Sequence, residues 1–195
     1  MSRARPSRRW GVFAAYVAVA YAVIPFTAVL GTQFVATPFG GWVFGPGLVL
    51  VVLAGALGML GWLRLRGAPL WAYLLIAAVG MAYFQVLGSL AVRPLERIHL
   101  PEYGLAAYLA WLAVRAHGTS AMAACAAAFV ITALVGWGEE VIQHFVPGRY
   151  YDWRDVALNA LSAVLALLAL MALRAGGPWR QAARRESRSA ATPSA

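Results

Sequence analysis

The sequence predicts an all-α protein that crosses a membrane several times, and three observations support this fold class. The 195 residues are 62% hydrophobic, with a mean hydropathy of +0.70, well above the usual composition of soluble domains. No charged side chain occurs from Trp10 to Leu63, or from Gly67 to Val92. Uncharged apolar runs of about 20 residues match the hydrocarbon core of a bilayer. We therefore expect a polytopic membrane helical bundle with about six transmembrane helices.

The apolar runs place these helices in order along the chain. The first follows a basic head at residues 1–9, and its run of about 21 residues exceeds the core of about 7–15 residues in a signal peptide. We expect an uncleaved span in which Pro25 causes a kink. Residues 37–47 have the glycine and proline density of a loop. The fourth span is short, since Glu102 to Arg115 reaches only about 20 Å at helical rise. The expected spans are residues 10–30, 43–63, 70–92, 102–117, 120–138 and 154–173.

The arginines predict how the bundle is oriented. Six spans put both termini on one side, where twelve of the sixteen arginines would lie, leaving four on the other side. The positive-inside bias then makes both termini cytoplasmic, including a basic tail at residues 174–195 that is too polar to fold. The net charge of +9 is explained by topology and by contact with anionic membrane lipids. Nucleic acid is not an expected partner.

Six of the seven acidic residues fall on the predicted outer side, in two segments. The first, ERIHLPEYG at residues 96–104, places His99 three residues before Glu102 and four before Tyr103. Residues at these spacings share a helix face, provided that the helix begins by residue 99. The second segment, GWGEEVIQHFVPGRYYDWRDVALN at residues 136–159, contains four of the acidic residues. We expect the two segments to converge into one polar site.

Several groups in the second segment need partners. Acidic residues at the C-terminal end of a helix oppose its dipole, so Glu139 and Glu140 require counter-charges. We expect Glu140 to lie at the water interface and Asp155 to cap the last helix. Asn159, one turn deeper, must find a hydrogen-bond partner. The arginines available as counter-charges are Arg97, Arg149 and Arg154.

These spaced residues resemble the VanZ-like family of bacterial membrane proteins. That family shows a basic residue, then H-x-x-E-Y-x-x-L, an acidic pair followed by Q, then P-x-R, D-x-x-D and N. The resemblance covers about residues 93–170, and we take 93–173 as a VanZ-like transmembrane region after helices at 10–92 that match no motif. Two positions depart from the pattern, Glu139 for the commoner Asp and Ser162 for the usual Gly. The matching residues are Arg97, His99, Glu102, Tyr103, Glu139, Glu140, Gln143, Pro147, Arg149, Asp152, Asp155 and Asn159.

The resemblance implies a cell-envelope context, because the namesake is associated with low-level resistance to the glycopeptide teicoplanin. The matched polar residues become candidate ligand-binding residues. One hypothesis is a noncatalytic protein whose outward site binds a lipid-linked, wall-precursor or antibiotic head group. Its arginines would pair with phosphate or carboxylate, and Tyr150, Tyr151 and Trp153 would lie at the interface.

The competing hypothesis is a membrane enzyme that modifies such a head group. Its candidate catalytic residues, taken from the same set, would act as general acid and base; they are His99, Glu102, Glu139 and Glu140. A transporter is disfavoured because the polar residues gather near one side of the membrane. The H-x-x-E spacing is too common to indicate a metal site, so we expect no metal or other cofactor.

Overall fold

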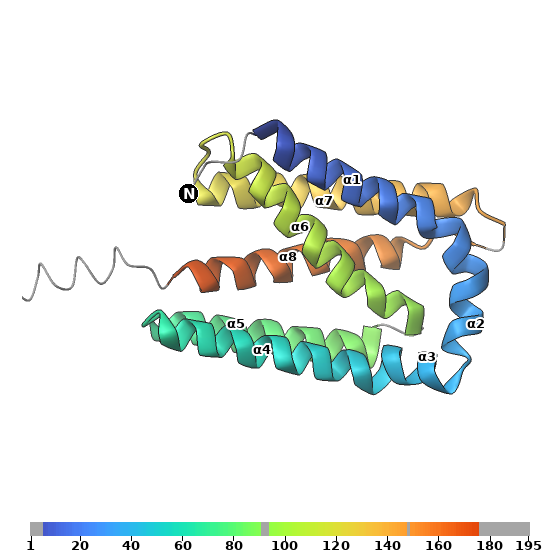
Figure 1. Ribbon diagram of the computed structural model, residues 1–195, viewed down its shortest axis with the longest axis horizontal. Helices are drawn as coiled ribbons and strands as arrows, with labels where there is room; N and C mark the ends of the chain where they lie inside the picture. Colours follow the sequence, from blue (N-terminus) through green and yellow to red (C-terminus); the bar gives the residue numbers. More distant parts are fainter. Residues whose placement is uncertain (1–5, 91–93, 148, 176–195) are drawn as a thin grey trace, which may run out of the picture.

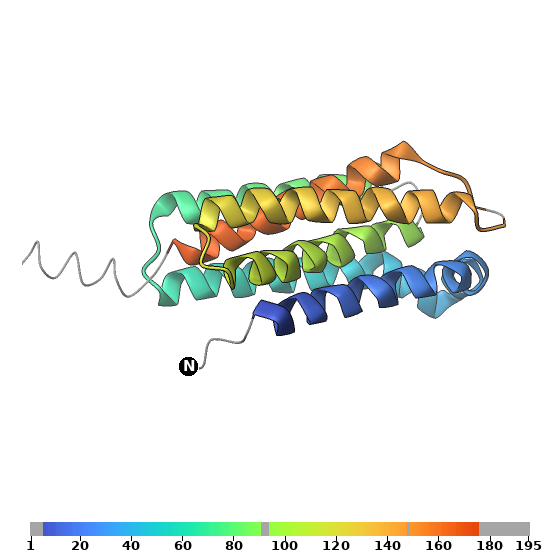
Figure 2. The same ribbon diagram turned by 90° about the horizontal axis from the view of Figure 1, so that it is seen from above.

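A computed structural model of the chain describes residues 6–90, 94–147 and 149–175, which form helices and their connections and contain no strand. Six long helices run back and forth along one axis (Figures 1 and 2), so that α1 begins and α8 ends at the same end of the bundle. They are α1 (Pro6–Phe26), α4 (Leu48–Leu65), α5 (Leu70–Gln85), α6 (His99–Arg115), α7 (Ala121–His144) and α8 (Trp153–Arg174). The expected all-α bundle is confirmed.

Five segments are long and apolar enough to cross a membrane, which makes this a multi-pass membrane protein. The short fourth span corresponds to α6, whose 17 residues reach about 26 Å at helical rise. α6 packs against α8, α7 and α1, in the middle of the bundle. Large apolar side chains such as Val51 and Leu57 are exposed on the outside, where lipid would cover them. The five segments are Pro6–Phe26, Pro38–Leu65, Leu70–Gly88, Ala121–His144 and Trp153–Arg174.

The loop expected at residues 37–47 is instead helical, which corrects the sequence-based interpretation. Thr37 caps α3 (Pro38–Trp42) by accepting a hydrogen bond from the Gly40 amide at 3.0 Å, and proline suits the first turn of a helix. A π-helix, η2 (Val43–Gly47), then leads into α4, with non-helical backbone at Gly45. Glycine and proline thus bend this segment without ending it.

At the end of the bundle opposite to the start of α1, the chain passes from helix to helix through short elements (Figure 1). α1 continues through Pro25 into the π-helix η1 (Thr27–Gly31) and α2 (Thr32–Val35). α2 and α3 then connect α1 to α4 (Figure 1). After α5, the π-helix η3 (Val86–Leu90) and the 3-10 helix η4 (Pro94–Ile98) lead to α6. Residues 1–5 of the basic head, Arg93 and residues 176–195 of the basic tail lie outside the described residues, and the head's last four residues belong to α1.

Small side chains hold the three central helices together. One core cluster joins α6, α7 and α8 through alanines that are almost completely buried. Small residues allow helices to approach closely in membranes, where apolar attraction between helices is weak. The alanines are Ala106, Ala107, Ala110, Ala124, Ala128 and Ala163. This packing fixes how the polar ends of the three helices face one another.

Two helix ends shape the polar region. α7 continues to His144, past the apolar span of 120–138, and carries Glu139 and Glu140 in its last turns, as expected for acidic residues at the C-terminal end of this helix. α8 begins at Trp153, and its cap is Asp152, whose carboxylate accepts a hydrogen bond from the Arg154 amide at 2.8 Å. The expectation that Asp155 caps this helix is therefore wrong. Residue 152 has the extended backbone that an N-cap requires, and Asp155 lies in the first turn.

Candidate functional site

The polar residues meet where α6 begins, α7 ends and α8 begins, at one end of the bundle (Figure 1). α6 starts at His99, so the condition for a shared face with Glu102 and Tyr103 is met. α6, α7 and α8 pack against one another along their lengths. The two predicted polar segments, far apart in the sequence, therefore form one cluster.

A chain of hydrogen bonds passes through Glu139, which is only 5% exposed. The Tyr103 hydroxyl donates to Oε2 of Glu139. Gln143 Nε2 donates to Oε1 of the same carboxylate at 2.8 Å, and Arg149 donates to the Gln143 amide oxygen at 2.5 Å. The amide thus links an arginine to a buried acid, and this network joins α6, α7 and the loop before α8.

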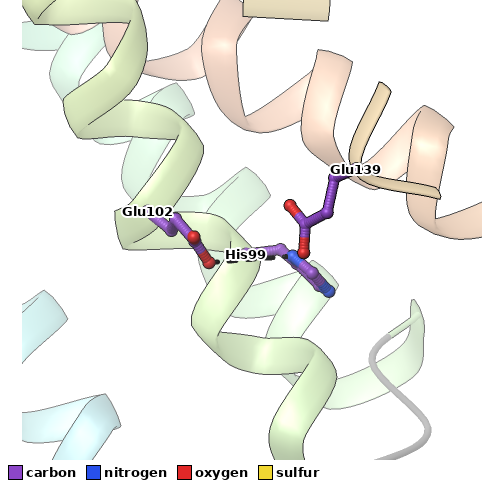
Figure 3. A group of neighbouring side chains, drawn as sticks. All are labelled: His99, Glu102 and Glu139. Atoms are coloured by element: carbon purple, nitrogen blue, oxygen red, sulfur yellow. Dashed lines mark ion pairs between the residues drawn. The ribbon is translucent and has the colours of Figure 1, made fainter. Parts of the chain in front are cut away.

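His99, Glu102 and Glu139 form a second arrangement in the same cluster. Each offers a nitrogen or oxygen atom within 4.8 Å of the others. Nδ1 of His99 lies 4.0 Å from Oε2 of Glu102. Figure 3 shows the Glu139 carboxylate reaching from α7 toward the His99 ring. The Glu102 backbone carbonyl also accepts a hydrogen bond from Tyr16 of α1 at 2.9 Å.

Glu140 lies deeper than expected. Its side chain is completely buried, which corrects the expectation of a residue at the water interface. One carboxylate oxygen accepts a hydrogen bond from the Asp152 amide at 3.1 Å, and Oε1 has no hydrogen-bond partner within the described part of the chain. The packing of α7 on α8 excludes water from this position. Asp152 and Asp155 are half-buried beside it, and Asp155 interacts electrostatically with His99 and Arg149.

Asn159 is also completely buried, and it does not have the expected partner. Neither atom of its amide forms a hydrogen bond with the described residues. The side chain is held against Gly136 of α7, where an added Cβ would lie 2.7 Å from Cβ of Asn159 and 3.1 Å from Cε1 of Tyr103. Gly136 therefore lets α7, α8 and the Tyr103 ring of α6 meet.

Arg97 does not join the carboxylates. Its guanidinium donates to the carbonyl of Phe44 in η2 at 2.8 Å, which ties the segment before α6 to the bend before α4. Of the expected counter-charges, Arg149 reaches the network through Gln143, and Arg154 has an exposed side chain.

Sequence reasoning missed three residues that support the site. Gly136 lies within the second polar segment, where a glycine one turn before an acidic pair signals close helix packing. Tyr16 and Tyr21 lie within the first apolar span. Tyr21 of α1 donates to the Val135 carbonyl of α7 at 2.6 Å. Two tyrosines five residues apart in a membrane helix are the signal that could have found them.

The polar end has many unused hydrogen-bonding atoms. Among the described residues, eight buried side-chain atoms lack a hydrogen-bond partner, and six of them belong to predicted site residues. Buried polar groups in proteins are usually paired. The six atoms are Nε of Arg97, Nδ1 of His99, Oε1 of Glu140, Nε of Arg149, and Nδ2 and Oδ1 of Asn159.

A large apolar groove lies between α4, α5, α6 and α8. Its volume is about 780 Å³. It is lined near the polar end by Pro101 and Gly104 of α6, and near the opposite end by Arg66 and Arg174. The groove therefore extends along the bundle beside the polar cluster. The predicted polar site residues do not line it, but the first turns of α6 border both the groove and the cluster.

Known proteins offer no independent support for an assignment. No family model, no curated protein and no solved structure matches this chain. The resemblance to VanZ-like proteins therefore rests on the motif residues between 93 and 170 alone. The candidate site is defined by its own geometry.

Proposed function

We propose that this chain is a VanZ-like cell-envelope protein that binds the head group of a lipid-linked or wall-precursor molecule in the outer leaflet. Binding would change the exposure of the glycopeptide target and so affect susceptibility to teicoplanin. The observation that carries this proposal is the concentration of unpartnered buried polar atoms at one end of the bundle. An unsatisfied buried group costs about 1–3 kcal/mol, and a polar ligand would offset that cost.

The chemistry of these atoms favours a head group with both anionic and hydroxyl or amide groups. The guanidinium of Arg149 suits phosphate or carboxylate. The free oxygen of Glu140 and the amide of Asn159 suit donors such as sugar hydroxyls and peptide N–H groups. Tyr150 and Trp153 are 85% and 70% exposed at the same end, as expected of aromatic residues at a membrane interface. The apolar groove beside the cluster offers a surface for the lipid tail.

The substitution Glu140→Gln tests the proposal. Glutamine can still accept the hydrogen bond from the Asp152 amide and removes a buried charge, so folded yield and thermal stability should stay near those of the wild type. A lost charge-assisted hydrogen bond weakens binding by at least about tenfold. We therefore expect mass spectrometry of the purified protein to find the co-purifying lipid strongly depleted. An expressing strain should also lose any decrease in teicoplanin susceptibility.

The matched control is His144→Gln, one turn later on α7 and exposed. It should keep both the co-purifying lipid and the phenotype. The proposal fails if Glu140→Gln retains the lipid at wild-type levels. It also fails if this variant is unstable and its residual function follows the amount of protein, because the cluster would then be structural.

A membrane enzyme remains the second candidate, supported by the approach of His99, Glu102 and Glu139 within 4.8 Å. A carboxylate pair beside an imidazole suits general acid–base chemistry on a head group. If the protein is an enzyme, wild-type protein incubated with the co-purified lipid should convert it to a product of different mass. Glu139→Gln should then slow conversion by about 10²–10⁴-fold. Absence of any conversion by the wild type would favour binding alone.

A further inference from the structure

The approach of His99, Glu102 and Glu139 has the composition of a metal site. One imidazole and two carboxylates each present a donor atom, and the three atoms lie within 4.8 Å of one another. Donor atoms around a tetrahedral Zn²⁺ are about 3.3 Å apart, because the bonds are about 2.0–2.1 Å long. Gathering the three atoms around an ion therefore needs movements of about 1.5 Å or less.

The histidine supplies an independent indication of a ligand. His99 is only 5% exposed, and its Nδ1 atom forms no hydrogen bond with any residue that the structure describes. This nitrogen is the atom that lies 4.0 Å from Oε2 of Glu102, and Figure 3 shows the Glu139 carboxylate directly beside the same ring. A buried imidazole nitrogen without a partner is unusual, and a metal ion would use its lone pair.

The groups around Glu139 resemble the outer shell of a metal ligand. Tyr103 donates to one of its oxygens and Gln143 to the other, and Arg149 holds Gln143 in turn. An ionised carboxylate has about four lone-pair positions, so both oxygens can accept these bonds and one can still bind an ion. Such partners fix the orientation of metal ligands and raise their affinity for the ion.

We infer that His99, Glu102 and Glu139 bind one divalent transition-metal ion, Zn²⁺ or Mn²⁺. Two carboxylates and one neutral imidazole balance a charge of +2, and a mixed nitrogen and oxygen set suits these ions better than Ca²⁺ or Mg²⁺. Three protein ligands leave a coordination position open, as in catalytic zinc sites. That position would suit an oxygen of water or of a phosphate. The inference concerns the ion alone and does not depend on the proposed head-group ligand.

Metal content of the full-length protein tests this inference. The protein would be purified in detergent without a polyhistidine tag, stripped with a chelator, and dialysed against Zn²⁺ or Mn²⁺. We expect about one ion per chain by elemental mass spectrometry, as for a single three-ligand site. Binding should also raise the thermal midpoint, because an ion that binds only the folded state stabilises it.

Variants locate the ion. His99→Ala and Glu139→Gln should lose it, whereas His144→Ala, which removes an exposed imidazole near the end of α7, should keep it. Tyr103→Phe preserves the ligands but frees one oxygen of Glu139, so the affinity should fall by about 10–100-fold. If His99→Ala or Glu139→Gln does not fold, Glu102→Gln replaces it, because Glu102 is the most exposed ligand, at 21% of its side chain.

Two results would overturn the inference. The first is a folded wild-type protein that binds neither ion in stoichiometric amount. The second is metal content that stays the same in His99→Ala, or in Glu102→Gln where that variant is used, because the ion would then lie elsewhere. Since only the ion is added, failure of this test leaves the lipid co-purification test unaffected.

Discussion

Gly136 shows how one residue sets the distance between helices at the polar end. A side chain at this position would lie 2.7 Å from Cβ of Asn159. That atom is next to the backbone of α8 and cannot rotate away. Separating α7 from α8 would also disturb the Tyr103 ring, which lies 3.1 Å from the same position. Gly136 is therefore needed because it lets α7 and α8 approach closely. It is not needed for an unusual backbone conformation, because it lies in ordinary helix.

We predict that Gly136→Ala destabilises the protein by about 1–3 kcal/mol, the usual cost of overpacking a well-packed core. Thermal unfolding in detergent would measure the change. The control is Gly80→Ala in α5, where an added Cβ meets nothing within 4 Å. Alanine gains about 0.5–1 kcal/mol over glycine in a helix, so the control should be unchanged or slightly more stable. Equal stability of the two variants would contradict the close packing of α7 and α8.

At the scale of elements, α1 supports a site to which it contributes no predicted residue. Its tyrosines donate to backbone carbonyls of the two helices that carry the acids. Tyr16 bonds to Glu102 of α6 at 2.9 Å, and Tyr21 bonds to Val135 of α7 at 2.6 Å. The Tyr21 hydroxyl also lies beside Gly138, where an added Cβ would be 2.8 Å away. α1 thus acts as a brace across the α6–α7 pair.

Removing one hydroxyl should loosen this brace without disturbing the core. Tyr21→Phe keeps the ring and loses the hydrogen bond, so we expect a loss of about 0.5–1.5 kcal/mol in unfolding free energy. Thermal unfolding beside the wild type would measure it. Tyr150→Phe, at a side chain that is 85% exposed, should leave stability unchanged. A Tyr21→Phe variant as stable as this control would show that α1 packs by apolar contact alone.

At the scale of the whole molecule, the polar cluster lies at the end of the bundle opposite to the start of α1 and the end of α8 (Figure 1). The arginine distribution predicts that this polar end faces outward. A ligand in the outer leaflet requires that orientation. The side of the membrane that each end faces therefore decides which molecules the site can meet.

Cysteine labelling in intact cells tests the orientation. Single cysteines would be introduced as Trp153→Cys and Ser187→Cys in a Cys125→Ala background, which removes the only native thiol. A reagent that cannot cross the membrane should label position 153 and not position 187. Lysed cells should show labelling at both positions, which controls for reactivity. The reverse pattern in intact cells would place the site on the cytoplasmic side.

Local spacing was enough to predict much of this protein. Charge-free apolar runs predict the long helices because a membrane helix needs about 20 such residues. The shared face of His99, Glu102 and Tyr103 follows from the helical repeat, and it appears because α6 begins at residue 99. The convergence of two polar segments follows from the need of buried polar groups for partners. These three features depend only on residues that are close in the sequence or on a general requirement of low-dielectric surroundings.

Only the tertiary structure decided which polar side chains come into contact with one another. The rotation and depth of each helix come from close packing of small residues such as Gly136, and sequence spacing within one helix does not specify them. That packing completely buries Glu140 and leaves the Asn159 amide without a hydrogen bond to the described residues. It also turns Arg97 toward Phe44 and brings Glu139 beside His99. The chain by itself therefore determined the membrane bundle and the polar residues at its end, whereas the packing of α6, α7 and α8 determined their arrangement as a site.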